Sequence, residues 1–331
     1  MFCPRLNHNV RLSQKGTLQV CGHMSVQPTE NFSSLDDLQN SSWLTNIKKQ
    51  FKENKWPNEC IRCKEIEDIG ETSVRQHSIN AHKKYVLENN EYIFVTGLID
   101  NVCNAACITC SAKSSTLIGK LSNNLFLVNN RKLFNTIPID QILVFEITGG
   151  EPSVSKSYKE ILSLLTEKTK YVRVNTNGKK FIPEIERLLQ AGIDVTVTLS
   201  IDGVGSVFDY MRWPIKWKEF NTTVNKYKEL EQKYSNLKLD FWVTVSALNV
   251  NDIDNIKKYA DTVNIPMSYA LLHEPLCLSI RYKNRFTFKI SDDHVLRDQS
   301  GTLENNETEL NAYIEKNDRI KNISINDFIK L

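Results

Sequence analysis

Long apolar runs and blocks of like charge are both missing from this sequence. No stretch approaches the length of about 20 apolar residues that spans a bilayer, so we expect no membrane segment. The first residues hold no apolar run after their first charges, so we expect no secretory signal and a cytoplasmic location. The net charge of +3 comes from interspersed Lys and Glu, so composition gives no positive case for a nucleic-acid partner.

Internal repeats and low-complexity tracts are also lacking. At 331 residues the chain is long for one ordinary domain. Its 40% apolar and 24% charged residues are ordinary globular values. We therefore expect one large domain with an appendage, or two domains, around a sizeable core.

Short apolar runs alternate with amphipathic segments from residue 92 onward. The runs are rich in β-branched and aromatic residues, as strands buried on both faces should be. The six runs are YIFVTGLI, ILVFEIT, YVRVNT, VTVTLSI, LDFWVTVSAL and MSYALL. Apolar residues recur at helical spacing between them, as in residues 157–170, 181–192 and 217–234. The alternation predicts an α/β fold with a parallel sheet, either a partial (β/α)6 TIM-like barrel or an open doubly wound sheet. Both architectures place chemistry at the C-terminal ends of the strands.

The two ends of the chain depart from this alternation. Residues 1–90 hold four of the eight cysteines and two expected helices, one over residues 42–54, whose apolar stripe we interpret as packing. Residues 276–331 are polar, with one or two helices expected near 309–320, and we interpret them as peripheral. The predicted domains are a Cys-rich N-terminal module over 1–90, a barrel over 91–275 and a C-terminal helical extension over 276–331.

Three cysteines crowd into eight residues directly after the first predicted strand. Disulfides among Cys103, Cys107 and Cys110 are geometrically awkward, and one thiol would always be left over. A structural zinc site needs four protein ligands. Three thiolates therefore either bind the metal together with a fourth ligand from elsewhere in the chain or leave one coordination position open. An iron–sulfur cubane held by three cysteines has one iron without a protein ligand, which a small molecule can chelate.

The spacing CxxxCxxC in CNAACITC, after a first strand, resembles the signature of the radical S-adenosylmethionine (SAM) enzymes. The surrounding NVCNAACITCSAKSS resembles their subgroup with a truncated "twitch" auxiliary-cluster module. The resemblance implies a 4Fe-4S cluster on Cys103, Cys107 and Cys110, with its open iron chelated by the amino and carboxylate groups of SAM. It implies that the backbone at Thr109 approaches the adenine. It covers residues 91–275 and favours the partial barrel over the open sheet.

Three further strand ends resemble the same family. The second strand ends FEITGGEPSVS, which implies that Gly149, Gly150 and Glu151 receive the methionyl ammonium group of SAM. Glycines let the backbone come close to a ligand, and carbonyls with a carboxylate suit a cation. The third and fourth strands end VNTNGKK and LSIDGVGSVFDYMRWP, which implies polar contacts to the ribose hydroxyls and the carboxylate from Asn175, Asn177, Ser200, Asp202 and Arg212.

The N-terminal cysteines form two pairs, Cys3 with Cys21 and Cys60 with Cys63. Two such pairs describe a closed four-thiolate site, for which zinc and an iron–sulfur cluster are both competent. CPRLNHNVRLSQKGTLQVCG resembles the opening half of the SPASM or twitch cluster motif, and CIRCKEIEDIGETSVRQHS the segment that follows it. The resemblance implies a second, auxiliary 4Fe-4S cluster, with zinc as the alternative. Nearby histidines are interpreted as surface or helix residues: His8, His23, His77 and His82.

The resemblance implies a radical SAM enzyme. Its reduced cluster would cleave SAM to a 5'-deoxyadenosyl radical that removes hydrogen from a small-molecule, peptide or protein substrate. An electron donor such as flavodoxin or ferredoxin is the implied partner. We predict that Tyr210 and His273 line the substrate cavity; we predict no catalytic residue and give Cys277 no role. The alternative is a zinc-stabilised, non-catalytic binding protein on the same barrel, although the intact glycines and Glu151 argue against it.

Overall fold

The computed structural model describes residues 1–85, 92–287, 296 and 299–329. One sheet of eight strands has the order β2-β1-β3-β4-β5-β6-β7-β8, and every pair in it is parallel except β1 with β2. The strands are β1 (Asn9–Leu12), β2 (Leu18–Gln19), β3 (Ile93–Gly97), β4 (Ile142–Ile147), β5 (Tyr171–Thr176), β6 (Asp194–Ser200), β7 (Leu237–Val245) and β8 (Met267–Leu271). A separate two-stranded sheet pairs β9 (Tyr282–Lys283) with β10 (Leu303–Asn305).

Helices precede, separate and follow the strands. Those of the N-terminal segment are α1 (Pro4–His8), α2 (Leu35–Gln39), α3 (Ser42–Lys52), α4 (Ile61–Asp68) and α5 (Val74–Tyr85). Those of the barrel and the C-terminal segment are α6 (Thr116–Leu121), α7 (Arg131–Phe134), α8 (Lys156–Leu164), α9 (Glu184–Gln190), α10 (Ser206–Met211), α11 (Trp217–Lys233), α12 (Ile253–Val263) and α14 (Glu307–Lys321). Short 3₁₀ helices cover Asn58–Cys60, Ile139–Gln141, Val250–Asp252, Leu276–Leu278 and Ile325–Asp327. Within the described ranges, no helix is long and apolar enough to cross a membrane.

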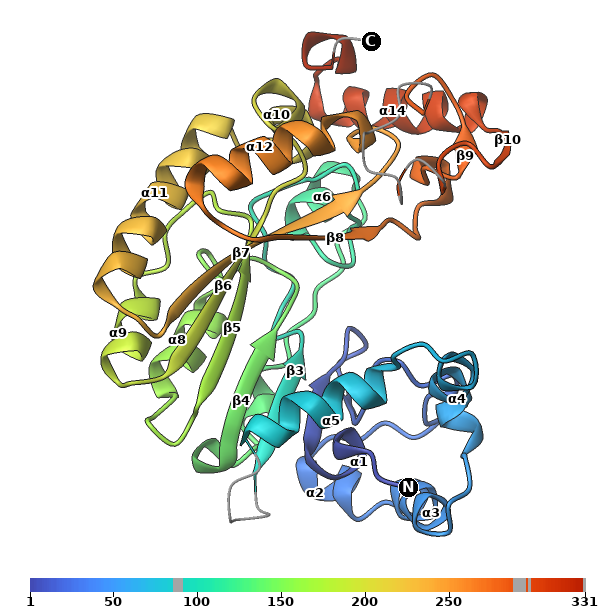
Figure 1. Cartoon of the computed structure of the whole chain (residues 1–331), viewed down its shortest axis with the longest axis vertical. Helices are drawn as coiled ribbons and strands as arrows, with labels where there is room; N and C mark the ends of the chain where they lie inside the picture. The colour runs from blue at the N-terminus through green and yellow to red at the C-terminus, as the bar shows by residue number, and fades with distance from the viewer. Residues whose placement is uncertain (86–91, 288–295, 297–298, 330–331) are drawn as a thin grey trace.

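The six predicted strands are all confirmed, as β3 to β8, and they neighbour one another in chain order. A doubly wound sheet would reverse its strand order at a switch point, which this sheet does not do. The helices α8, α9 and α11 cover the outer face of a curved wall, whose other face is open (Figure 1). Between the described strands β2 and β8 no pairing closes the wall. The predicted partial barrel is therefore confirmed.

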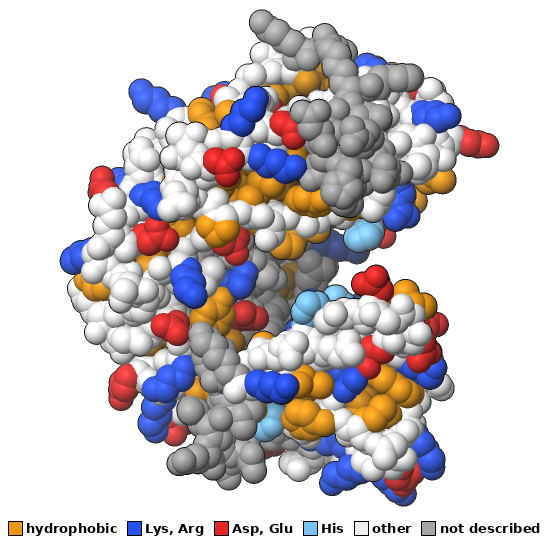
Figure 2. All heavy atoms as spheres, in the orientation of Figure 1, with side chains coloured by type: hydrophobic (Ala, Val, Ile, Leu, Met, Phe, Trp, Pro, Cys, Tyr) orange, Lys and Arg blue, Asp and Glu red, His pale blue; other side chains and the backbone are white. Residues whose placement is uncertain are grey.

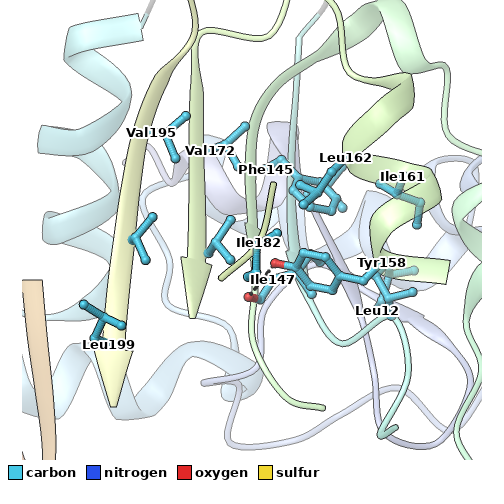
Figure 3. Close-up of a cluster of buried hydrophobic side chains, with 14 of the residues drawn as sticks. Leu12, Phe145, Ile147, Tyr158, Ile161, Leu162, Val172, Ile182, Val195 and Leu199 are labelled. Atoms are coloured by element: carbon cyan, nitrogen blue, oxygen red, sulfur yellow. Dashed lines mark hydrogen bonds between the residues drawn. The ribbon is translucent and has the colours of Figure 1, made fainter. Parts of the chain in front are cut away.

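The core lies between the outer face of the sheet and the helices, as Figure 3 shows for α8. This helix repeats apolar residues at three- and four-residue steps, so that Tyr158, Ile161 and Leu162 are all buried against the sheet. The Tyr158 hydroxyl donates to the carbonyl of Ile147 at 3.4 Å. Each such side chain contributes about 1.5–3 kcal/mol when it is fully buried. This packing fixes β4, whose C-terminal end carries part of the site described below.

The inner face of the sheet differs from the prediction of strands buried on both faces. Residues along β5 and β7 alternate between buried and partly exposed positions, and Trp242 on β7 is 40% exposed. Arg173 crosses this inner face between Glu146 at 3.7 Å and Asp240 at 3.3 Å. An incomplete barrel leaves its interior open to water, which explains the polar side chains. Figure 2 shows the molecule notched on one side, between the N-terminal and C-terminal segments.

The N-terminal segment extends the barrel sheet, which the sequence did not predict. Strand β1 pairs in parallel with β3 from Asn9 opposite Phe94 to Leu12 opposite Gly97. The predicted helix over residues 42–54 is confirmed as α3, and its apolar stripe is buried as expected. The predicted boundary between residues 90 and 91 lies outside the described residues.

The C-terminal segment is not peripheral, and that prediction was wrong. Its predicted helix exists as α14, but Leu310 and Ile314 on this helix are buried in one apolar cluster with Ile108 and Tyr210. Ile108 lies between the second and third cysteines of the barrel. The C-terminal helix is therefore part of the wall around the three-cysteine loop.

His82 joins the N-terminal segment to the barrel and gives a test of that contact. Its ring stacks on Phe94 with 3.6 Å between centroids, and its Nδ1 lies 3.3 Å from the Tyr92 hydroxyl. Burial, followed by the charges of His8 and Arg5, lowers the pKa of His82 from 6.5 to about 3. The unfolded chain therefore binds a proton below pH 6.5 that the folded chain excludes. Stability from this group is complete above that pH and is lost as the pH falls toward 3.

We expect the wild type to lose about 2 kcal/mol more unfolding free energy than a His82→Phe variant between pH 7 and pH 5. Phenylalanine keeps a ring against β3 but does not titrate. Urea denaturation of both proteins at the two pH values measures the difference. An identical pH dependence in both proteins would contradict the assignment.

Candidate functional site

The cysteine loop, residues 103–110, leaves the C-terminal end of β3 and is held by backbone contacts from distant parts of the chain. The amides of Ala106 and Ile108 donate to the carbonyls of Trp213 at 2.7 Å and Met211 at 3.1 Å, just after α10. From α14, the Tyr313 hydroxyl donates to the carbonyl of Ile108 at 2.9 Å. The loop therefore has a fixed shape that local sequence alone does not impose.

The three thiols of this loop lie close enough to interact electrostatically with one another. The amide of Ala105 donates to the Cys103 sulfur at 3.4 Å. Burial raises the pKa of Cys103 and of Cys110 to about 12, and it also raises the pKa of Cys107. Raised thiol pKa values are typical of unreactive, buried cysteines and not of nucleophiles. Iron would have to displace these protons on binding, as metals do with cysteine ligands.

The glycine turn, residues 149–151, lies against the cysteine loop at the end of β4. The amide of Glu151 donates to the carbonyl of Val102 at 2.7 Å. Gly150 has φ +63°, and a Cβ there would lie 2.6 Å from the carbonyl oxygen of Asp100. Gly149 has φ +87°, and its Cβ would meet Leu98 at 2.4 Å. Both glycines are thus required by conformation and by close approach to the strand that carries the cysteines.

The Glu151 carboxylate is buried, and it joins the glycine turn to the end of β5. It accepts hydrogen bonds from the Thr176 hydroxyl at 2.8 Å, the Asn177 amide at 2.7 Å and the Ser153 amide at 3.0 Å. Burial raises the pKa of Glu151, and these hydrogen bonds oppose that rise. With three of about four acceptor positions occupied, the carboxylate has little capacity left for a ligand. Its evident structural task is to hold two loops together, which the sequence did not predict.

The next strand ends supply the remaining predicted side chains. The Asn177 side chain donates to Asn104 of the cysteine loop at 2.8 Å, while the buried Oδ1 of Asn175 has no partner among the described residues. Ser200 ends β6 and is half-buried. Thr109, between the second and third cysteines, is also half-buried. The structure therefore brings the predicted polar residues to one rim of the barrel.

Asp202 and Arg212 form a buried ion pair at this rim. The Arg212 guanidinium donates to Asp202 at 2.9 Å, and the other carboxylate oxygen accepts from the Thr244 amide at 2.8 Å. Burial acts to lower the pKa of Arg212, but its interactions with the Cys107 sulfur and the Asp202 carboxylate outweigh burial and raise that pKa above its usual range. Arg212 stays charged beside the cysteine loop, with its Nε unpaired in the described part of the molecule.

The two residues predicted to line the substrate cavity, Tyr210 and His273, lie in different surroundings. Tyr210 is fully buried, and its hydroxyl donates to Asp318 of α14 at 2.9 Å, so its assignment to an open cavity was wrong. The cause is the C-terminal helix, which covers this side of α10. His273 is exposed just beyond β8, and its role stays a prediction.

The four N-terminal cysteines meet at one pocket, as their pairing predicted. This cysteine pocket has an empty volume of about 370 Å³. Its cysteines lie just before α1, just after β2, at the end of the 3₁₀ helix Asn58–Cys60 and within α4: Cys3, Cys21, Cys60 and Cys63. Burial raises the pKa of Cys3 to about 11 and also raises that of Cys60. In the ranges that the structure describes, no three His, Cys, Asp or Glu side chains form a group that could hold a single metal ion.

Charged and imidazole side chains complete this pocket. Arg5 and Arg75 line it, and so does His23, whose amide donates to the Cys21 sulfur at 3.4 Å. His23 is exposed, as interpreted, but nothing in the sequence indicated that it also lines this pocket. The other three histidines lie within helices, as interpreted.

The barrel rim fits a ligand with cationic and anionic groups beside an iron–sulfur cluster. The three thiols interact electrostatically with one another, and the two glycines let the next strand end pack closely against the chain that leads into the cysteine loop. Eleven buried side-chain polar atoms lack partners among the described residues, and three of them belong to residues at or beside this rim: Asn175 Oδ1, Arg212 Nε and Lys321 Nζ. Buried polar groups are normally hydrogen-bonded, so unpaired ones around one rim are consistent with a missing ligand. Lys321 and Tyr313, both on α14, and Asn104 were not found by sequence reasoning.

Comparison with known proteins defines the class. The model of the radical SAM superfamily matches residues 99–260, which run from the end of β3 into α12. Residues 99–260 therefore form a radical SAM domain. This family implies a 4Fe-4S cluster and SAM as cofactors.

Individual relatives match about half of the chain. It is 25% identical over 159 residues to the sporulation killing factor maturation protein SkfB of Bacillus subtilis, covering 48% of this chain and 37% of SkfB. It is 27% identical over 171 residues to the mycofactocin maturase MftC of Mycolicibacterium smegmatis, covering 51% of this chain and 41% of MftC. The matched region thus spans less than half the length of these curated relatives. The crystal structure of Streptococcus suis SuiB bound to the precursor peptide SuiA aligns over 95% of this chain and 69% of SuiB, with 16% identity and a TM-score of 0.40.

Proposed function

We propose that this protein is a radical SAM enzyme that modifies a peptide or protein. The observation that carries the proposal is the locked contact between the cysteine loop and the glycine turn at neighbouring strand ends. Cys103, Cys107 and Cys110 would hold a 4Fe-4S cluster with one open iron. Reductive cleavage of SAM to a 5'-deoxyadenosyl radical is the chemistry that cluster and SAM supply when bound.

The residues of this chain would bind and orient SAM at the rim. The carbonyls of the glycine turn suit the ammonium group, because Glu151 is already engaged by the protein. Asn175 offers its unpaired oxygen to a hydroxyl, and Arg212 offers its free Nε to a carboxylate. Asp202 orients Arg212 for that contact. Thr109 would approach the adenine through its backbone, and Ser200 would contact the ribose hydroxyls.

We further propose an auxiliary 4Fe-4S cluster in the cysteine pocket, used for electron transfer. Four thiolates from three chain segments line one pocket, and Arg5 and Arg75 lie on its wall. These cations offset the negative charge of a fully thiolate-ligated cluster. Zinc on the same four thiolates remains the alternative that metal analysis distinguishes. The module over 1–90, the barrel over 91–275 and the extension over 276–331 are the corresponding proposed domains.

A peptide substrate is supported by the open inner face and by two relatives named for maturation. A groove with an empty volume of about 1020 Å³ lies between α5 and residues of strands β3 to β7. It carries charges of both signs, from Arg5, Arg173, Lys238 and Glu146. Such a surface suits an extended chain with charged side chains. A flavodoxin or ferredoxin as electron donor, and the cytoplasm as location, complete the proposal.

The test is anaerobic reconstitution followed by iron analysis and SAM cleavage with dithionite. We expect about eight irons per wild-type chain under the two-cluster proposal, and release of 5'-deoxyadenosine. The triple variant Cys103→Ala, Cys107→Ala, Cys110→Ala should keep about four irons. It should release no 5'-deoxyadenosine. The matched control, Cys60→Ala with Cys63→Ala, should keep the barrel cluster and still cleave SAM.

Two results would contradict the proposal. Zinc without iron in the reconstituted wild type would favour the non-catalytic binding protein. Release of 5'-deoxyadenosine by the variant without the three loop cysteines would place the chemistry elsewhere. A candidate peptide is labelled with deuterium, and it is accepted as the substrate when deuterium from it appears in the released 5'-deoxyadenosine.

A further inference from the structure

The last residue of α14 is a lysine buried beside the cysteine loop. Lys321 is 7% exposed, and its Nζ has no hydrogen-bond partner among the described residues. Lysine is almost never fully buried unless it is paired with an anion. Burial lowers the pKa of Lys321 to about 8, and Cys107, Asp318 and Cys110, in decreasing order, oppose that lowering. Two of these three are predicted iron ligands.

Asp318 does not serve as a dedicated partner for this lysine. Its Oδ1 accepts from the Tyr210 hydroxyl at 2.9 Å, and its Oδ2 accepts from the amide of Ile325 at 2.8 Å. Arg212, the other cation near the thiols, is already paired with Asp202. The ammonium of Lys321 is therefore buried without a hydrogen-bonded anion among the described residues, and Cys107 and Cys110 are among the groups near enough to interact with its charge.

The position of Lys321 is fixed by the rest of its helix. Leu310 and Ile314 are buried in the apolar cluster around Ile108, and the Tyr313 hydroxyl donates to the carbonyl of Ile108. The helix ends at Lys321, where the negative end of its dipole favours a cation. Packing, a hydrogen bond and the dipole thus hold one positive charge against the loop.

We propose that Lys321 is a positioning residue whose buried ammonium stabilises the reduced form of the cluster on Cys103, Cys107 and Cys110. The inference rests on the proposed function. Reduction adds one electron, and hence one negative charge, to the cluster and its thiolates. A fixed cation in a water-poor site favours that form, and net charge is among the factors that set cluster potentials. The C-terminal helix would therefore raise the reduction potential of the cluster.

The experiment is a redox titration of the reconstituted holoenzyme, followed by electron paramagnetic resonance. The signal that changes on addition of SAM identifies the barrel cluster. At the wild-type midpoint potential, we expect the ratio of reduced to oxidised barrel cluster to fall at least tenfold in Lys321→Met, a shift of about 59 mV for a one-electron couple. Lys321→Arg should recover most of the wild-type ratio, since it keeps the charge.

Two further variants distinguish the effect of losing the positive charge from the effect of disturbing the fold. Lys316→Met changes an exposed lysine on the same helix and should leave the ratio unchanged. Lys321→Gln removes the charge but keeps a polar side chain, and should reproduce the shift even if the methionine variant binds iron poorly.

An unchanged midpoint in a neutral Lys321 variant that retains the barrel cluster would overturn the inference. Weaker SAM binding with an unchanged midpoint would also overturn it, and would make the lysine a SAM ligand. Failure of the proposed function can be distinguished from failure of this inference, because the wild type would then show no cluster signal that changes on addition of SAM.

Discussion

Replacing Gly150 by alanine is expected to reduce 5'-deoxyadenosine release at least 100-fold. The new Cβ would lie 2.6 Å from the carbonyl oxygen of Asp100 and 3.1 Å from that of Val102, so the turn or the cysteine loop must move. The positive φ of +63° adds strain for any residue with a Cβ. A displacement of about 1 Å at a reacting centre costs on the order of 100-fold in rate. Quantifying 5'-deoxyadenosine under dithionite reduction measures the loss.

Gly192 provides the matched control for this substitution. It has a similar φ of +76°, but a Cβ there would meet nothing within 4 Å. Gly192→Ala therefore costs about 1–2 kcal/mol of backbone strain and should leave SAM cleavage near the wild-type rate. Equal rates in the two variants would show that contact between the glycine turn and the cysteine loop does not matter for the reaction.

Replacing Arg212 by methionine is expected to lower the free energy of unfolding by about 3–5 kcal/mol. The substitution leaves the carboxylate of Asp202, whose side chain is 1% exposed, without its cation. Removing one partner of a buried pair is costly because the other charge stays buried and unpaired. Urea denaturation of the variant and the wild type at pH 7 measures the loss.

The companion variant is Asp202→Asn combined with Arg212→Met. Asparagine keeps an acceptor for the Thr244 amide without a buried charge, so the double variant should regain much of the lost stability. A double variant no more stable than Arg212→Met would mean that the loss came from packing. Both proteins should also bind SAM poorly if Arg212 receives its carboxylate.

The strands and the rim of the site could be predicted from the sequence. Runs of β-branched and aromatic residues are long enough to identify β3 to β8, and parallel strands bring their C-terminal ends to one edge. The cysteine loop and the glycine turn follow β3 and β4, so the contact between Glu151 and Val102 follows from topology. The four-cysteine pocket was predictable for a different reason, because thiol pairs at such spacing have few other uses.

The elements that escaped prediction are those whose sequence carries little local pattern. Strand β1 has four residues and β2 has two, which is too short for periodicity to be read. The helix α14 was predicted, but its partner Ile108 lies some two hundred residues earlier in the chain. Only the folded chain shows that this polar segment covers the cysteine loop and buries Tyr210.

The pairing of β1 with β3 has a consequence for the integrity of the molecule. Strand β3 carries the cysteine loop at its C-terminal end, and β1 covers what would otherwise be its free edge. A chain shortened to the barrel would expose the unpaired amides and carbonyls of β3, which are a template for aggregation. The two thiol sites thus belong to one cooperative folding unit, and neither half is expected to serve as an autonomous fragment.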